Sequence, residues 1–292
     1  MNLFLQLLAN GIVNGAMFAL LAIGFGLIYR SLRVFHIAYG ACFVVSAFVY
    51  WSLVTKAGLP WSVAGLFTVL CSAAMGGLLE RGLYWPFFRR ESSSEAVLVA
   101  SIGLAIMIEN AMALIFGNQI VAIPRGLSES VMFGPIRLTM IQLWQFAICV
   151  AVAGGVVALL QFRHFKVVLA MGENPELVQV LGHSLSRYRM LVLAIGTATA
   201  AIPACLVMTD VGMDVHAGMS YLLIAAVAVL AGGLARVHGW LLGAFLLAIL
   251  QSVVIWKFSA KWTELVAFAL LLSILLFRRE GLVGVRKRME EA

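Results

Sequence analysis

The amino-acid sequence predicts an all-α polytopic membrane protein, with about eight or nine transmembrane helices in a single domain over residues 1–292. The first observation is composition: 63% of the residues are hydrophobic and 11% are charged, whereas soluble domains carry roughly 25% charged residues. The second is that apolar residues fall in runs of about 20, the length that a helix needs to cross the hydrocarbon core. The third is that lysine and arginine are concentrated in alternate connections, as in polytopic membrane proteins.

Apolar runs account for most of the chain, and polar connections separate them. Each run is close to the length of a membrane-spanning helix. We predict helices over residues 8–29, 36–55, 61–79, 96–116, 141–161, 189–209, 219–235, 238–256 and 262–277. The connections at 30–35 and 235–238 are short, and one or both are also consistent with a break inside a helix.

The basic residues predict the orientation in the membrane. One set of connections and the C-terminal tail contain Arg30, Arg33, Arg81, Arg89, Arg90, Arg163, Lys166, Arg187, Arg189, Arg236, Arg278, Arg279, Arg286, Lys287 and Arg288. The other set contains only Lys56, Arg125, Arg137, Lys257 and Lys261. Cytoplasmic connections carry the excess of lysine and arginine, so we expect the first set and the C-terminus to be cytoplasmic. The net charge of +7 is explained in this way and does not call for a nucleic-acid partner.

The N-terminus and the cysteines fit a mature membrane domain. The opening residues MNLFLQLLANG contain neither a basic leader nor a small-residue cleavage site, so we expect them to remain in the protein. Cys42, Cys71, Cys149 and Cys205 lie in apolar runs without C-x-x-C spacing. We therefore predict that these cysteines act as small buried hydrophobic residues.

The segment GENPELVQVLGHS, residues 172–184, is polar where its neighbours are apolar, and it predicts a short cytoplasmic helix. Asn174 is a suitable N-cap, because its side chain can accept a hydrogen bond from an amide of the first turn. Pro175 suits the first helical position, where no amide bond is lost. Gly182 is a natural stop after the last turn. The predicted helix covers residues 174–181.

One face of this short helix is apolar, with Leu177, Val178 and Leu181. A helix of two turns is only marginally stable in water, so packing must hold that face. Two interpretations are open: the face rests on lipid headgroups, or it docks into a groove of a partner protein. Interfacial helices usually combine bulky aromatic residues with lysine and arginine. Glu173 and Glu176 stand here instead, which favours a protein partner.

The segment resembles the coupling helix of ABC importer permeases, which sits in a cleft of the ATPase subunit. More closely, the chain is similar to the LivH-type permeases of branched-chain amino acid importers. The matching stretches read LVQVLGHSLSRYR and LAIGTATAAIPACL around the short helix. Further matches are NGAMFALLAIGFGLIYRSLRVFHIAYGA over 14–41, HAGMSYLLIAAVAVLAGGLARVHGWLLGAFLLAIL over 216–250, and FRREGLVG near the C-terminus.

The resemblance implies a function and a set of partners. It implies a permease subunit that moves branched-chain or related amino acids across the bacterial inner membrane, together with a second related permease, two ABC ATPase subunits and a periplasmic substrate-binding protein. ATP would stay on the ATPases, so no enzyme activity and no cofactor are expected in this chain. The residues implied to couple to the ATPase are Glu173, Asn174, Pro175, Glu176, Leu177, Leu181 and Gly182.

The chain departs from the family pattern in places that bear on the substrate. Where the family has N-F-A-H-G, residues 36–40 read HIAYG, and Arg30 replaces a usual glycine. Arg236 and His238 stand where small residues or proline are common. Related permeases of this family serve urea, amides and aromatic acids. Urea, amides and aromatic acids are therefore alternative substrates to branched-chain amino acids.

Asn14, His36, Tyr39 and Glu109 are the candidates for lining a translocation path. An ionisable group inside a span is a functional candidate by default, although Glu109 near the outer end also fits a satisfied interfacial carboxylate. His36 and Tyr39 lie at a predicted helix break, which fits either a path lining or a turn at headgroup level. Asn14 fits close packing of the first span or, as the second interpretation, a pore lining.

Motifs for chemistry are missing from the sequence. It contains no G-x-x-x-x-G-K-[ST] run, no H-E-x-x-H and no G-x-S-x-G. The sequence thus favours transport over an enzyme. A stand-alone secondary transporter or channel is the alternative, and the pairs Arg33 with His36 and Arg236 with His238 are a weak sign of the repeat that such proteins contain.

Overall fold

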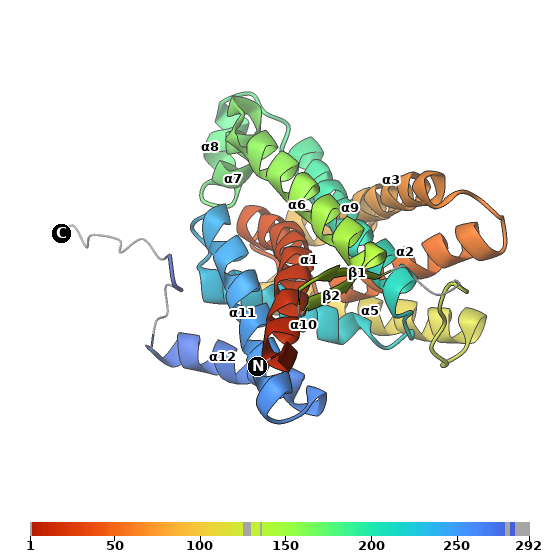
Figure 1. The fold of residues 1–292 in the computed structure, drawn as a ribbon. Coiled ribbons are helices and arrows are strands. Elements are labelled where there is room, and N and C mark those ends of the chain that lie inside the picture. Colours follow the sequence, from red (N-terminus) through yellow and green to blue (C-terminus); the bar gives the residue numbers. More distant parts are fainter. Residues whose placement is uncertain (1, 125–129, 135, 278–280, 284–292) are drawn as a thin grey trace.

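The computed structural model describes residues 2–124, 130–134, 136–277 and 281–283, and it is a bundle of helices with one small hairpin (Figure 1). In chain order the elements are α1 (Asn2–Leu32), α2 (Ala38–Thr55), α3 (Trp61–Leu79), the π-helical turn η1 (Glu80–Tyr84), α4 (Trp85–Arg89), α5 (Ser94–Phe116), β1 (Ser130–Phe133), β2 (Ile136–Thr139), α6 (Met140–Gln161), α7 (Arg163–Met171), α8 (Pro175–Val180), α9 (Leu185–Asp210), α10 (Gly218–Gly232), α11 (Val237–Lys257), the 3₁₀ turn η2 (Ala260–Trp262) and α12 (Thr263–Phe277). The strands pair antiparallel.

Every predicted span coincides with an apolar helix, which confirms the predicted fold class. In the described part of the chain, seven helices are long and apolar enough to cross a membrane. The helices α10 and α12 have 15 residues each, about 22 Å at the usual rise per residue, and so fall short of the roughly 30 Å core. Gly233 ends α10 early, because its φ of 94° is left-handed and breaks the helix.

The two short connections separate distinct helices. The first lies between Leu32, where α1 ends, and Ala38, where α2 begins. The second lies between Gly232 and Val237, the adjacent ends of α10 and α11. Glycine allows α10 and α11 to approach closely, since a methyl group on Gly232 would collide with the backbone of Gly239.

The helix α1 forms the centre of the bundle (Figure 1). In its membrane-spanning window 89% of the residues are buried, against 11% for α5 at the periphery. Leu20, Leu21 and Ile23 are fully enclosed. A helix that is apolar all round and buried all round is expected at a core position. The exposed apolar side chains of α3 and α5 suit contact with lipid.

Connections predicted to be cytoplasmic meet at one end of α1. The guanidinium of Arg30 donates to the carbonyl of Ala235 at 2.5 Å, and Arg33 donates to that of Gly172 at 3.0 Å. The short helices α7 and α8 lie at this end, opposite the N-terminus (Figure 1). The side chains of Arg125, Arg278, Arg279, Arg286, Lys287 and Arg288, which also entered the orientation argument, lie outside the described residues.

Among the described residues, connections predicted to face outward contact one another and not the cytoplasmic set. Val121 and Met213 exchange two backbone hydrogen bonds, and the indole of Trp51 donates to the carbonyl of Ala122 at 3.2 Å. Near the N-terminus, the side-chain amide of Gln6 donates to the carbonyl of Arg137 and accepts a hydrogen bond from its backbone amide. The structure thus keeps the two sets of connections apart.

The cysteines only partly follow the prediction. Cys42, Cys149 and Cys205 are buried, but Cys71 is exposed. The prediction was wrong for Cys71 because apolar sequence does not distinguish a core position from one on the outer face of a span. Only 22% of the spanning window that contains α3 is buried.

Candidate functional site

The short helix α8 forms where the local sequence predicts it. The side chain of Asn174 accepts a hydrogen bond from the amide of Leu177 at 3.0 Å, so it is the predicted N-cap. Pro175 occupies the first helical position. Gly182 follows the helix with a φ of 82°, a left-handed conformation that glycine adopts without strain.

The apolar side chains of α8 divide between two environments. Val178 is 2% exposed and packs against the bundle, whereas Leu177 is 53% and Leu181 is 64% exposed. Val180 is also exposed. The sequence predicted that Leu177, Val178 and Leu181 share one apolar face. In the structure Val178 faces the bundle, whereas the two leucines face outward. Because Leu177 and Leu181 are four residues apart, they lie on the same outer side of the segment.

The segment before α8 is attached to the end of the central helix α1. Besides the bond from Arg33 to Gly172, Arg30 and Glu173 form an ion pair at 4.0 Å. A methyl group on Gly172 would collide with the carbonyl oxygen of Arg30. Glycine at this position thus allows the backbone before α8 to lie directly against the backbone at the end of α1.

We expect Gly172→Ala to push the α8 segment away from α1. Overpacking against a backbone carbonyl typically costs about 1–3 kcal/mol, and no flexible side chain is there to move aside. The measurement is the melting temperature of the purified protein, together with its transport rate. Gly103→Ala on α5 is the matched control, since a methyl group there meets nothing within 4 Å. Wild-type values for both quantities in the Gly172 variant would contradict this account of the contact.

A buried ion pair links the end of α3 to α9. Arg189 Nε donates to Glu80 Oε1 at 2.5 Å, and the guanidinium lies 4.4 Å from the ring centre of Phe88. Arg189 is 4% exposed and Glu80 is 1% exposed. Arg189 was predicted to lie with the basic residues of the connections, and this prediction was wrong, because Arg189 lies within α9 and its side chain is buried. An acidic residue at the end of an apolar run, as Glu80 is, was the available signal.

A large cavity of about 900 Å³ separates α8 from this region. Its wall includes Glu176 and Gln179 from α8, and Arg33, Arg89 and Arg189 from the other side. The cavity leaves α8 accessible from the end of the bundle where the predicted cytoplasmic connections meet.

His36 and Tyr39 lie in the core of the bundle. His36 Nδ1 is 2.5 Å from the hydroxyl of Tyr84, and that hydroxyl in turn lies 2.9 Å from Ser101 Oγ. The hydroxyl of Tyr39 donates to the carbonyl of Leu21 at 2.9 Å. These bonds fix the start of α2 against α1 and α5. A role of the two residues in a translocation path stays a prediction.

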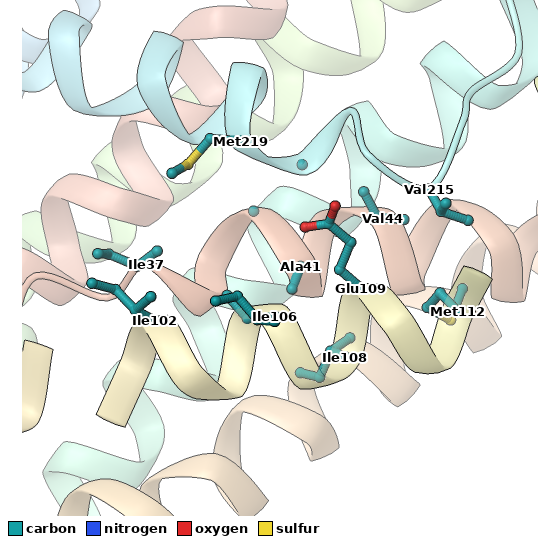
Figure 2. A pocket seen from close by; sticks show the side chains of 13 residues that line it. Ile37, Ala41, Val44, Ile102, Ile106, Ile108, Glu109, Met112, Val215 and Met219 are labelled. Atoms are coloured by element: carbon teal, nitrogen blue, oxygen red, sulfur yellow. The ribbon is translucent and has the colours of Figure 1, made fainter. Parts of the chain in front are cut away.

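Glu109 lines a small apolar cavity of about 190 Å³ between α2, α5 and the start of α10. Figure 2 shows its carboxylate pointing from α5 across the face of α2, among Ala41, Val44 and Met219. Glu109 Oε1 lies 2.5 Å from His216 Nδ1, a partner that sequence reasoning missed because the two are far apart in the chain. The structure therefore gives this carboxylate a partner of its own.

Asn14 lines a different cavity, of about 520 Å³, together with polar residues from α6, α9, α10, α11 and α12. The structure thus places the four proposed path residues in three separate environments. Among the described residues there is no group of three or more histidine, cysteine, aspartate or glutamate side chains that could hold a metal ion.

Comparison with a known protein structure supports the fold. The chain is similar to a chain in the structure titled PsaBC from Streptococcus pneumoniae in complex with Fab, with a TM-score of 0.50 and 15% sequence identity over 92% of this chain and 90% of that one. At this level of identity the likeness concerns the fold alone.

Comparisons of sequence are more specific. The chain is 28% identical to the high-affinity branched-chain amino acid transport system permease protein BraD of Pseudomonas aeruginosa, over 96% of each chain. It is 26% identical to LivH, the corresponding permease protein of Escherichia coli, again over 96% of each chain. The family model described as branched-chain amino acid transport system / permease component matches residues 7–275. The predicted resemblance is confirmed, and the chain belongs to this family of transport permeases.

Proposed function

We propose that this chain is the membrane permease subunit of a bacterial ABC importer for branched-chain or related amino acids. Family membership supports this function, because the match extends over nearly the whole chain and over nearly the whole length of the curated relatives. The apolar helices support a position in the inner membrane. The C-terminus and α8 would lie on the cytoplasmic side, where lysine and arginine concentrate.

One observation carries the coupling role of α8. A capped helix between two spans exposes Leu177, Val180 and Leu181, while Val178 and the Gly172 contact hold it to the bundle. Apolar side chains exposed on a short polar connection are expected where a partner protein covers them. The position of α8 between α7 and α9, and the contact of the preceding Gly172 with the end of α1, suit an element that passes movement to the bundle.

The partners would be two ABC ATPase subunits, a second related permease that forms a heterodimer with this chain, and a periplasmic substrate-binding protein. Closure of the ATPase dimer on ATP would move α8. The contact of Gly172 with the end of α1 would pass that movement to the central helix. Bond-breaking chemistry would remain on the ATPases.

The experiment is reconstitution in proteoliposomes. The chain, the second permease and the ATPases are purified together, and uptake of labelled leucine is measured with the binding protein and ATP. We expect uptake only when all parts and ATP are present. Directional transport by this chain alone would contradict the proposal and would support a stand-alone transporter. Uptake of urea, an amide or benzoate instead of leucine would support an ABC importer with a different substrate.

A further inference from the structure

The cavity of about 900 Å³ beside α8 lies among the helix ends of the predicted cytoplasmic side. Its volume is within the range of roughly 300–1,000 Å³ for small-molecule pockets. The wall combines the end of α1, the turn between α4 and α5, the first turns of α5 and one side of α8. A molecule in this cavity would therefore contact the predicted coupling helix and a membrane-spanning helix at the same time.

The helix α8 turns different sides toward the cavity and toward the outside. Pro175, Glu176 and Gln179 line the cavity. Leu177 and Leu181 are exposed and do not line it. Because successive residues of a helix are about 100° apart, these two sets lie on roughly opposite sides of the segment. The cavity is thus distinct from the apolar surface that the proposed function assigns to the ATPases.

Charges of both signs line this cavity without pairing with one another. Arg33 and Arg89 contribute positive charges to the wall, and the negative charges come from two glutamates, Glu91 and Glu176. Within the described ranges of the chain, none of these four forms an ion pair, whereas the remaining charged lining residue, Arg189, has a buried partner of its own. A ligand that carries both an anionic and a cationic group would compensate both sets of charges.

The arginines of the cavity suit a phosphate group, because a guanidinium offers several N–H donors in one plane. Arg33 uses Nε for the carbonyl of Gly172, which leaves its two terminal nitrogens for a ligand. The side chain of Arg89 makes no hydrogen bond to the described residues. The hydroxyls of Ser92 and Ser94 line the same wall and can donate as well. Donors for a phosphate thus come from the end of α1 and from the turn before α5.

The apolar part of the wall adjoins the side of the bundle that suits lipid. Leu32, Phe35, Val97 and Leu98 line the cavity. Only 11% of the spanning window of α5 is buried, and Leu98 and the adjacent Val99 are exposed. An acyl chain could lie along this surface, which a soluble ligand would leave uncovered. A polar headgroup joined to apolar chains matches both parts of the wall, as in the basic pockets between spanning helices that hold lipid headgroups.

We propose that this cavity binds a phospholipid of the cytoplasmic leaflet whose headgroup carries both a phosphate and a primary ammonium. The phosphate lies between Arg33 and Arg89, and the acyl chains follow α5. The ammonium faces Glu91 and Glu176. Because Glu176 belongs to α8, the bound lipid connects the predicted coupling helix to the bilayer, and headgroup composition biases its position. This site goes beyond the proposed transport function, and its occupancy can be measured without ATPases.

Addition of defined lipids tests which headgroup the cavity recognises. The full-length chain is delipidated in a neutral maltoside detergent, and its melting temperature is measured as lipid is added. The probes are phosphatidylethanolamine, phosphatidylcholine and phosphatidylglycerol with the same acyl chains, and soluble glycerophosphoethanolamine. We expect phosphatidylethanolamine to raise the melting temperature at the lowest concentration, because phosphatidylcholine lacks ammonium N–H donors and phosphatidylglycerol lacks the ammonium.

Two outcomes of this titration would contradict the proposal. An equal rise with phosphatidylcholine would show that the ammonium is not recognised. An equal rise with glycerophosphoethanolamine, which has the headgroup but no acyl chains, would assign the cavity to a soluble phosphate compound and rule out the lipid.

Matched pairs of neighbouring residues separate the site from general surface charge. Arg89→Gln and Glu91→Gln each remove one charge from the cavity wall. Each should raise the half-saturating concentration of phosphatidylethanolamine about three- to fivefold, the size of an exposed ion pair. Arg90→Gln and Glu95→Gln remove the same charges from exposed positions outside the cavity wall, and they should leave this concentration unchanged. Equal effects in the two pairs would overturn the proposal.

Native mass spectrometry gives a measurement that does not depend on unfolding. The chain is released from nanodiscs that contain equal amounts of phosphatidylethanolamine and phosphatidylglycerol. We expect the released protein to retain phosphatidylethanolamine preferentially, and Arg89→Gln/Glu91→Gln to lose this preference. A preference that survives in the double variant would rule out the site. If the double variant instead keeps its lipid and loses co-purifying ATPase, the cavity belongs to the ATPase contact and the lipid proposal is wrong.

Discussion

Leu177→Ala/Leu181→Ala is expected to reduce ATP-driven uptake about tenfold or more while the protein still inserts and folds. Both side chains are more than half exposed, so their removal leaves no cavity in the bundle. If they fill a groove of the ATPase, truncation of such anchors costs about 1–2 kcal/mol each in docking, and 1.4 kcal/mol corresponds to a factor of ten. Uptake and ATP hydrolysis are measured in parallel in proteoliposomes.

Two variants separate docking from folding in this experiment. Leu114→Ala removes an equally apolar side chain that is 89% exposed on α5, and transport should not change. Val178→Ala removes the buried anchor of α8 and should lower the melting temperature as well as uptake. Undiminished leucine uptake in the double variant, with the same ATPase content, would rule out α8 as the coupling element.

Arg189→Ala is expected to destabilise the folded protein by about 3–5 kcal/mol, because it leaves the carboxylate of Glu80 buried without a partner. The side chain of Glu80 is 1% exposed, so its carboxylate has lost most of its hydration and depends on the guanidinium for compensation. Contact of Arg189 with the ring of Phe88 is lost at the same time. Thermal unfolding in detergent, monitored by tryptophan fluorescence, gives the change in the stability of the folded protein.

A double replacement tests this explanation directly. Glu80→Gln/Arg189→Met removes both charges and keeps similar volumes, so it should recover most of the stability that Arg189→Ala loses. If the double variant is as unstable as Arg189→Ala, the loss comes from packing around Phe88 and not from the unpaired charge. Arg187→Ala, two residues away on α9 and exposed, is the matched control and should behave like the wild type.

Features that depend on local chemistry could be predicted from the sequence. The cap by Asn174, the proline at the first turn and the glycine stop act within a few residues, so α8 was predicted almost to the residue. The spans were predicted because apolar runs of sufficient length have few other stable states in a membrane. Their ends were predicted less well, since the φ of Gly233 and not hydropathy ends α10.

Features that depend on distant neighbours could not be predicted. Glu80 and Arg189 are 109 positions apart, and nothing in either local sequence indicates the other. The division of α8 into a buried Val178 and an exposed Leu177 is decided by the bundle behind it. Gln145 reads as an ordinary polar residue near the start of a span until the structure shows that its oxygen is buried.

The bonds at the end of α10 have a consequence for any shortened version of the protein. The amides of Leu282 and Val283 donate to the carbonyls of Ala231 and Gly232 at 2.9 and 3.1 Å. The last carbonyls of a helix have no partner within that helix, so the chain that follows α12 supplies the C-terminal cap of α10. A chain that stopped before Leu282 would leave these two carbonyls without their donors.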